Sequence, residues 1–376
     1  MIPISLYIHI PWCVRKCPYC DFNSHQSPAV RPEWDYMNAL IADIEQDLLL
    51  YPAQTLSTIF IGGGTPSLIS AACYDYLFTE IKKRIAWRDD IEITLEANPG
   101  TIERGRFADY HAIGINRLSL GIQSFNPKHL QQLGRIHDDR QAHDAIQQAQ
   151  QAGFSNLNID IMHSLPQQTF TEALADLQQT IQYAPAHISW YQLTLEPNTE
   201  FYRTKPVLPH EELTADIEEA GFALLHQHHY QHYEISAFCQ QDRMANHNLN
   251  YWLFGDYYGI GAGAHGKHTN PGVNCISRTQ KYRQPKDYLN PNKPYLTQHT
   301  RLDPKTLVFE FMLNVSRLEQ MIHFQLFPAR TGLYLEHLMP KLDLAAERGL
   351  IVYHPNGWQI TALGRRFTND LQALCL

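Results

Sequence analysis

Six short segments of the chain alternate apolar and polar residues with the period of two that is typical of β-strands, and they recur at intervals of roughly 30 residues. Longer segments with the apolar spacing of helices lie between them. The predicted strands are Leu6 to Ile10, Thr58 to Ile61, Ile91 to Glu96, Arg117 to Ile122, Leu157 to Met162 and Ile188 to Leu195. The predicted helices are Glu33 to Leu50, Ala71 to Ile85, Arg104 to His111, Asp138 to Ala152 and Thr171 to Tyr183.

Strands that alternate with helices in this order predict parallel strands joined by right-handed crossovers. Six such units suggest a barrel that is not closed, so the expected fold is α/β with an incomplete (βα)6 barrel over residues 1–238. In parallel α/β folds, ligands bind at the C-terminal ends of the strands. The polar and glycine-rich motifs of this chain fall at those ends.

The pattern changes after residue 238. Residues 239–300 are rich in Tyr, Gly, Asn and Pro, and we expect an irregular connecting region there. Residues 301–376 predict a C-terminal helical domain, with helices near 304–317 and 334–348 and then two short strands around the turn pair Asn356-Gly357. Helices followed by such a hairpin are typical of a winged helix.

Composition narrows the class of protein. The chain has 376 residues, 44% of them hydrophobic, and a net charge of -8, so no basic excess is available to bind nucleic acid. It contains no run approaching the ~20 apolar residues that span a bilayer, and its first residues do not read as a signal peptide, so we expect a cytoplasmic protein. Seven cysteines without an export signal favour metal or redox chemistry over disulfides.

Three of those cysteines lie within eight residues, in CVRKCPYC directly after the first predicted strand. Cys13, Cys17 and Cys20 could hold three corners of a four-iron, four-sulfur cluster and leave one iron open to another ligand. A structural zinc site usually has four ligands in two pairs, so a zinc completed by His9 or His25 is the weaker alternative. Chance clustering of inert thiols is weaker still. The other four cysteines are expected to be dispensable.

These cysteines and further motifs give the chain a family resemblance. The motifs are YIHIPWCVRKCPYCDF (7–22), GGGTPS (62–67), EANPG (96–100), SLGIQSF (119–125), LGRIH (133–137) and NIDIMHSLPQQT (158–169). The chain resembles a radical S-adenosylmethionine (radical SAM) protein of the group related to oxygen-independent coproporphyrinogen III oxidase. The resemblance implies a [4Fe–4S] cluster on the three cysteines, whose open iron binds S-adenosylmethionine and whose electron cleaves it to a 5'-deoxyadenosyl radical.

The same resemblance implies further contacts to S-adenosylmethionine. The glycines of GGGTP would let the backbone approach the ligand, and Glu96 could accept hydrogen bonds from its amine or ribose. Each of these residues could instead be an ordinary turn or surface residue. The implied contacts are Tyr7, Tyr19, Gly63, Gly64, Thr65, Glu96, Gln123, Arg135 and Asp160.

Two functions compete within this group. True coproporphyrinogen oxidases carry one more cysteine two positions after the triplet, where this chain has Phe22. CPYCDF together with HNLNYW (247–252) resembles instead the HemW family, which is described as binding haem and inserting it into respiratory proteins. In that motif, His247 could be an axial haem ligand. The alternatives are the oxidase and some other radical chemistry.

The HemW resemblance also implies partners. They are a haem donor such as bacterioferritin and haem-accepting respiratory enzymes, and both peripheral membrane contact and a homodimer are compatible with it. Three local features remain open: the four histidines of HQHHYQHY (226–233), expected at a solvent-facing helix end; His265 in GIGAGAHG, near a ligand or in a structural turn; and Ser164 and Gln167, where family members commonly have glycine. If those glycines admit a ligand, the added side chains would narrow the site.

Overall fold

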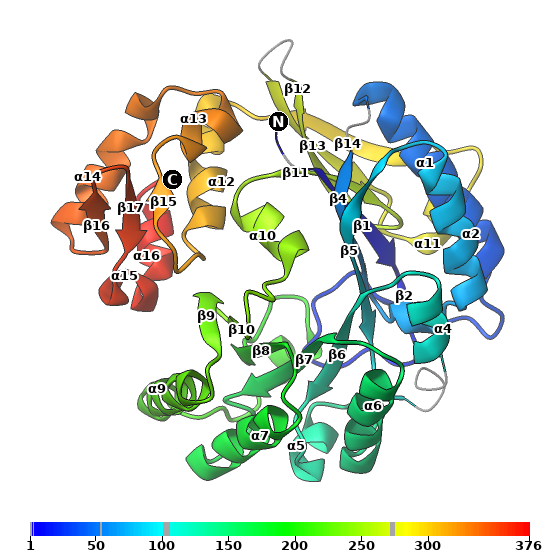
Figure 1. Cartoon of the computed structure of the whole chain (residues 1–376), viewed down its shortest axis with the longest axis horizontal. Helices are drawn as coiled ribbons and strands as arrows, with labels where there is room; N and C mark the ends of the chain where they lie inside the picture. The colour runs from blue at the N-terminus through cyan, green and yellow to red at the C-terminus, as the bar shows by residue number, and fades with distance from the viewer. Residues whose placement is uncertain (1, 3, 53–54, 101–105, 271–274) are drawn as a thin grey trace.

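The computed structural model describes residues 2, 4–52, 55–100, 106–270 and 275–376 (Figure 1). Its largest sheet contains the six predicted strands as parallel neighbours in chain order. The prediction of six parallel strand–helix units is therefore confirmed. These strands are β1 (Ile4–Ile10), β4 (Leu56–Gly63), β5 (Trp87–Ala97), β6 (Arg117–Gln123), β7 (Asn156–His163) and β8 (His187–Gln192).

The five predicted helices are present apart from their ends, while α5 between β6 and β7 was not predicted and α8 and α9 follow β8. Two of them begin with a capping box: Asp138 and Gln141 exchange hydrogen bonds at α6, and Thr169 and Glu172 do so at α7. The start predicted at Arg104 lies outside the described residues, and the strand predicted to reach Leu195 ends earlier, before the turn that precedes α8. The helices are α1 (Glu33–Leu50), α2 (Ala71–Lys82), α4 (Phe107–Ala112), α5 (Pro127–Gln132), α6 (Asp139–Gln151), α7 (Phe170–Gln182), α8 (Glu200–Thr204) and α9 (Glu211–Gln227).

The two faces of the parallel strands differ in polarity. Successive side chains of a strand point to opposite faces, and on every one of these strands one face is aliphatic and belongs to the main hydrophobic core, as with Leu118 and Leu120 of β6. The other face carries mostly polar or small residues, with Phe60 and Met162 as exceptions. Examples on that face are Thr58, Glu96, Ser119, Gly121, Asn158 and Asp160.

The expectation of an irregular connector over residues 239–300 is wrong. β11 (Asp256–Ile260) pairs in parallel with β1, and β12 (His265–Asn270), β13 (Cys275–Lys281) and β14 (Leu296–Arg301) continue the sheet as antiparallel neighbours. At the opposite edge, β10 (Ala237–Cys239) and β9 (Gln231–Glu234) extend the sheet beyond β8. Between these two additions lies α10 (Asn246–Trp252), and α11 (Pro285–Tyr288) precedes β14.

A buried ion-pair cluster explains why a polar segment can form the strand β13. The ammonium of Lys281 is fully buried and donates to Asp43 and to Asp47 of α1, at 2.6 Å for the second carboxylate. Tyr288 donates to Asp43 as well. Buried charges require such partners, and these come from a helix more than 200 positions earlier in the chain.

The C-terminal residues form a separate lobe with its own hydrophobic core, shown in orange and red in Figure 1. The predicted helices and the hairpin around Asn356-Gly357 are present, and a short third strand, β15, completes a small sheet with the hairpin. Within the described residues, no helix is both long and apolar enough to cross a membrane. The elements of the lobe are α12 (Pro304–Val315), β15 (Ile322–His323), α13 (Leu326–Thr331), η2 (Leu335–His337), α14 (Met339–Glu347), β16 (Ile351–His354), β17 (Gly357–Ile360), α15 (Ala362–Arg366) and α16 (Thr368–Ala373).

Candidate functional site

A cavity of about 390 Å³ opens at the C-terminal ends of the parallel strands, behind the loop that follows β1. This is the end of the sheet at which parallel folds bind ligands. All three clustered cysteines line it, together with most of the polar residues that the sequence motifs single out. The cavity-lining residues among the predicted ones are Cys13, Cys17, Tyr19, Cys20, Gly63, Gly64, Thr65, Glu96, Gln123, Arg135 and Asp160.

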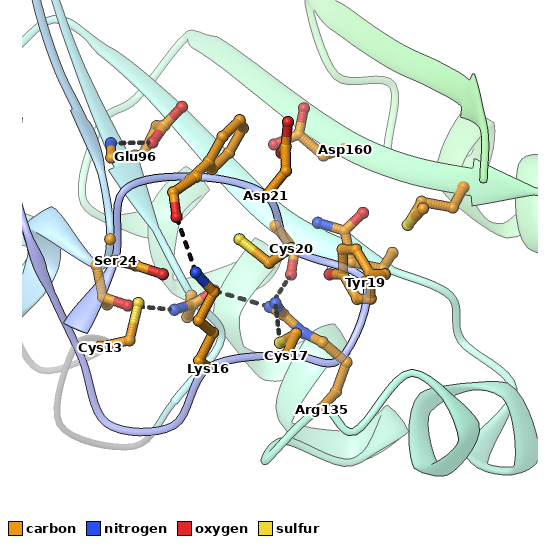
Figure 2. Close-up of a pocket in the computed structure, with 18 of the residues that line it drawn as sticks. Cys13, Lys16, Cys17, Tyr19, Cys20, Asp21, Ser24, Glu96, Arg135 and Asp160 are labelled. Carbon is orange, nitrogen blue, oxygen red and sulfur yellow. Dashed lines mark hydrogen bonds between the residues drawn. The ribbon is translucent and has the colours of Figure 1, made fainter. Parts of the chain in front are cut away.

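The three cysteines are free thiols on one loop (Figure 2). A short parallel pair of strands, β2 (Trp12–Cys13) and β3 (His25–Gln26), closes the base of this loop. Burial raises the pKa of Cys13 and of Cys20, which favours the thiol form over the thiolate in the absence of a metal. Arg135 approaches from the far wall, with Nη1 3.7 Å from Sγ of Cys17.

The glycines of GGGTP are required by the packing of this loop. Gly63 has φ +112°, and a Cβ there would lie 2.5 Å from the ring of His9; a Cβ on Gly64 would lie 2.6 Å from the carbonyl oxygen of Trp12. The backbone of this segment bonds directly to the cysteine loop, with Thr65 N donating to Trp12 O at 2.7 Å. The positive φ and the His9 ring therefore account for Gly63, and close approach to the Trp12 backbone accounts for Gly64, whatever ligand they also face.

Two carboxylates stand close together on the polar face of the sheet. Burial, and then the neighbouring charge of Asp160, raises the pKa of Glu96 to about 8. Burial also raises the pKa of Asp160, although Ser119 and Asn158 donate hydrogen bonds to it. A cationic group in the cavity would stabilise the ionised form of both carboxylates. This wall therefore suits a ligand that carries an amine or a sulfonium.

Arg135 connects the cysteine loop to the strand ends. Its Nη2 donates to Asn98 Oδ1 at 2.7 Å and to the Gly121 carbonyl at 2.6 Å, while its buried Nε has no hydrogen-bond partner. Asn98 in turn donates to the hydroxyl of Thr65. Asn98 lines the cavity and was missed from the sequence, although it lies in the quoted EANPG motif.

Gln123 ends β6 in the left-handed conformation, with φ 72°. Its Oε1 accepts a hydrogen bond from Tyr191 at 2.7 Å, and both side chains line the cavity. Tyr191 was also missed, because it lies inside a strand and carries no motif. Tyr191 lies on the polar face of β8, which four other strands separate from β1, so only the assembled sheet brings it to the cavity.

The two tyrosines predicted to flank the site differ. Tyr19 lines the cavity, and burial raises the pKa of its hydroxyl. Tyr7 does not belong to the cavity lining; its hydroxyl donates to His9 Nδ1 at 2.9 Å. Tyr7 thus supports the loop through His9 and has no direct contact with the cavity in this structure.

The zinc alternative has little support from these contacts. His9 uses its second nitrogen, Nε2, to donate to the Asn23 carbonyl at 2.8 Å, and burial lowers its pKa to about 4. His25 places Nε2 3.1 Å from the Arg283 carbonyl. Both histidines therefore hold the cysteine loop in place. Within the described part of the chain, no three His, Cys, Asp or Glu side chains are gathered around one point as ligands of a single metal ion.

His247 lies inside the molecule on α10, and its side chain is buried. Thr58 donates its hydroxyl hydrogen to Ser5, so His247 Nδ1 donates to Thr58 at 2.8 Å, and Nε2 accepts from Tyr251 at 2.8 Å. Burial lowers the pKa of His247 to about 3. With both nitrogens engaged, neither is available to haem iron in this arrangement. The geometry therefore argues against the predicted role of His247 as an axial ligand.

The backbone of α10 is held as firmly as this ring. The carboxylate of Glu92 accepts hydrogen bonds from the backbone N–H groups of Asn246 and His247 at the start of the helix. At its other end, α10 packs between the sheet and α12 of the C-terminal lobe (Figure 1). The HNLNYW segment therefore packs against both the sheet and the C-terminal lobe and connects their cores.

The remaining motifs lie outside the cavity. Gly261 and Gly263 both have positive φ, so GIGAGAHG forms a structural turn, and His265 does not line the cavity. Three histidines of HQHHYQHY are exposed near the end of α9, as expected, whereas His232 is half-buried on β9.

The structure gives another explanation for the two substituted glycine positions. Ser164 and Gln167 each have φ 56°, the left-handed region that favours glycine, and neither lines the cavity. Glycine at these positions would avoid backbone strain. The expectation that their side chains narrow the ligand site is therefore wrong.

The comparisons with known proteins agree with this arrangement. A model of the radical SAM superfamily matches residues 7–179, and a model of the HemN C-terminal domain matches residues 302–367. The solved structure of coproporphyrinogen III oxidase (HemN) from Escherichia coli, titled a radical SAM enzyme, superposes with a TM-score of 0.83 at 23% identity and covers 100% of this chain and 90% of that chain. The fold is thus the incomplete α/β barrel of the radical SAM class.

Full-length relatives narrow the class further. The heme chaperone HemW of Haemophilus influenzae is 48% identical, and that of Escherichia coli is 46% identical; each match covers 100% of this chain and 98% of the relative. The heme chaperone HemW of Bacillus subtilis is 32% identical over 98% of this chain and 97% of its own length. The chain belongs to the HemW family of radical SAM proteins.

Proposed function

We propose that this protein is a haem chaperone that carries a [4Fe–4S] cluster on Cys13, Cys17 and Cys20, binds S-adenosylmethionine in the adjoining cavity and delivers haem to respiratory proteins. The observation that carries the cluster is that three free thiols of one loop line the same cavity as Glu96, Asp160 and the glycine-rich segment. The relatives named heme chaperone support the cargo.

The chain's own residues would have distinct parts in this site. The thiols would hold the cluster, which supplies one-electron chemistry when bound. Glu96 and Asp160 would attract the amine and the sulfonium of S-adenosylmethionine, because burial raises the pKa of both carboxylates and a cationic ligand would stabilise their ionised forms. Arg135 would keep the cysteine loop at a fixed distance from the strand ends, since it bonds to both sides.

Coproporphyrinogen oxidation is the alternative function. HemN from Escherichia coli shares the fold, but at 23% identity the likeness shows the fold alone. Phe22 stands where the oxidases have a further cysteine, and its ring is exposed at the mouth of the cavity. This position therefore has no thiol to contribute to oxidase chemistry.

One anaerobic experiment separates the two functions. Reconstituted protein is incubated with coproporphyrinogen III, a reductant and S-adenosylmethionine, and a parallel sample is titrated with haem. The chaperone predicts stoichiometric haem binding without porphyrinogen turnover. Formation of protoporphyrinogen over many turnovers would reject the chaperone in favour of the oxidase. Methionine and 5'-deoxyadenosine released together with another modified metabolite would indicate a different radical reaction.

The partners belong to the same proposal. A haem donor such as bacterioferritin, a respiratory acceptor at the membrane, and a homodimer follow from the resemblance to haem chaperones. A pull-down with haem-loaded bacterioferritin and vesicles containing a haem-free respiratory enzyme tests them: haem should move from donor to acceptor only when this protein is present. Transfer at the same rate without it would reject the delivery role.

A further inference from the structure

Three large apolar side chains are exposed around the mouth of the cavity. Val14, Phe22 and Ile136 are 46%, 57% and 51% exposed, and all three line the opening. Val14 and Phe22 come from the cysteine loop, whereas Ile136 follows α5 more than 100 positions later in the chain. Contiguous exposed apolar groups of this kind mark binding surfaces in soluble proteins.

The backbone that carries two of these side chains is fixed. Asn23 next to Phe22 donates to the carbonyl groups of Ala262 and Arg283. Lys16, labelled in Figure 2, donates from Nζ to the Phe22 carbonyl at 3.0 Å. The ring of Phe22 is thus held outward by a loop that is anchored on both sides. It presents a preformed apolar surface, which reduces the entropy lost on binding.

Basic groups lie next to this apolar surface. Arg15 and Lys16 are exposed on the same loop and line the same opening. Lys16 uses one of its three N–H hydrogens for the Phe22 carbonyl, so two remain for a ligand. The acidic residues Asp21 and Glu196 line the opening as well, so the surface is of mixed charge, with its cations beside Val14. An apolar ligand with carboxylate arms fits this combination.

The other cavity near the HNLNYW helix suits such a ligand less well. It measures about 210 Å³ and lies between α10, the strands β11 to β13 and α12. Its two basic residues are already paired: Lys267 with Asp256 at 2.8 Å and Arg278 with Glu310 at 2.7 Å. A carboxylate arriving there would have to displace an internal partner.

We propose that haem docks against the mouth of the cysteine cavity, with its macrocycle on Val14, Phe22 and Ile136 and its propionates toward Arg15 and Lys16. This inference rests on the proposed haem-binding function and assigns it a site. The cargo then lies directly over the opening through which S-adenosylmethionine would enter. Haem and S-adenosylmethionine should therefore influence each other's binding.

The test is a haem titration of anaerobically reconstituted protein, followed by the haem absorption band. Phe22→Asp and Ile136→Asp should each weaken haem binding by about tenfold, since a buried charge replaces apolar contact. Leu363→Asp is the matched control, because Leu363 is 46% exposed on the C-terminal lobe; it should leave affinity unchanged. Arg15→Glu combined with Lys16→Glu should weaken binding most at low salt.

The outcomes distinguish this site from the function itself. Ile136 lies outside the cysteine loop. If Phe22→Asp loses its iron and sulfide, the haem affinity of Ile136→Asp therefore decides whether haem binds at this site. If Ile136→Asp binds haem as tightly as the wild type, the site assignment is overturned while the haem-binding function stands. If the wild-type protein binds no haem, the proposed function fails.

Discussion

The cysteine cavity and His247 of α10 both lie on the polar face of the sheet, but their buried ionisable groups differ in their surroundings. In the cavity, Glu96 and Asp160 repel one another, and the Nε of Arg135 has no partner. In α10, both ring nitrogens of His247 are bonded, and Glu92 accepts from the start of the helix. Two buried carboxylates that repel one another favour a cationic ligand, whereas a neutral ring with both nitrogens bonded favours packing.

The cavity side of this comparison gives the largest expected effect. Replacing Cys13, Cys17 or Cys20 individually by Ser should abolish stable four-iron binding, since each thiolate would hold a different corner. Iron and sulfide analysis after anaerobic reconstitution measures this. Cys275→Ser is the control, because Cys275 lies on β13, away from the cavity, and its cluster content should equal that of the wild type. A cluster lost from the control would show the ligand assignment to be wrong.

Substitution of His247 in α10 should lower the stability of the fold and leave ligand binding unchanged. His247→Ala removes two buried hydrogen bonds and leaves a void, so the free energy of unfolding should fall by about 2–4 kcal/mol. Urea titration measures this fall, and Tyr251→Phe, which removes one of the same bonds, should cost about 1 kcal/mol. The haem band should be unchanged in both variants. A shifted band in His247→Ala alone would restore this histidine as a ligand.

Acidity should affect the cavity through Glu96. Its pKa is raised to about 8 in the folded protein, so below that pH the carboxyl is protonated and attracts a cation less. Affinity for S-adenosylmethionine should therefore rise as the pH increases toward 8, by up to about tenfold per unit. Calorimetry at several pH values measures this slope, and Glu96→Gln should flatten it.

The raised pKa of Glu96 should make the stability of the fold change with pH in the opposite direction to the affinity for S-adenosylmethionine. An acid whose pKa is raised by folding binds its proton more tightly in the folded state, so stability falls as the pH rises from the ordinary value of 4.5 toward 8. Glu96→Gln should lose this dependence. If the ligand-free wild type and the variant show the same slope of stability with pH, Glu96 does not carry the shift.

The smallest expected effect concerns the loop after β7, which belongs to neither region. Gln167 is exposed with φ 56°, so Gln167→Gly should raise the free energy of unfolding by about 0.5–1 kcal/mol. Ser164→Gly relieves the same strain but loses the hydrogen bond to Thr214, so its net effect should be near zero. Thermal unfolding compares the two. Ligand affinity that changed in either variant would place this loop in the site after all.

The sequence predicted the parallel strands because their pattern is local: aliphatic residues at every second position mark a face that packs on helices. It also identified most of the cavity, since its motifs end strands that meet at one edge. It missed β13, because Lys281 is buried only through Asp43 and Asp47 of a distant helix. It did not show that His247 is buried, because the Thr58 and Tyr251 contacts that occupy the ring depend on tertiary structure.

The place of β1 in the sheet has a consequence for how the protein is made. β1 lies between β4 and β11. During synthesis, one edge of β1 can pair with β4 soon after both are made, whereas the other edge stays unpaired until residues 256–260 are made. While the ribosome completes the intervening two hundred residues, the nascent chain exposes an unpaired strand edge that could pair with other chains. Slow synthesis or truncation before residue 256 should therefore promote aggregation, and a chaperone that covers this edge would raise the yield of native protein.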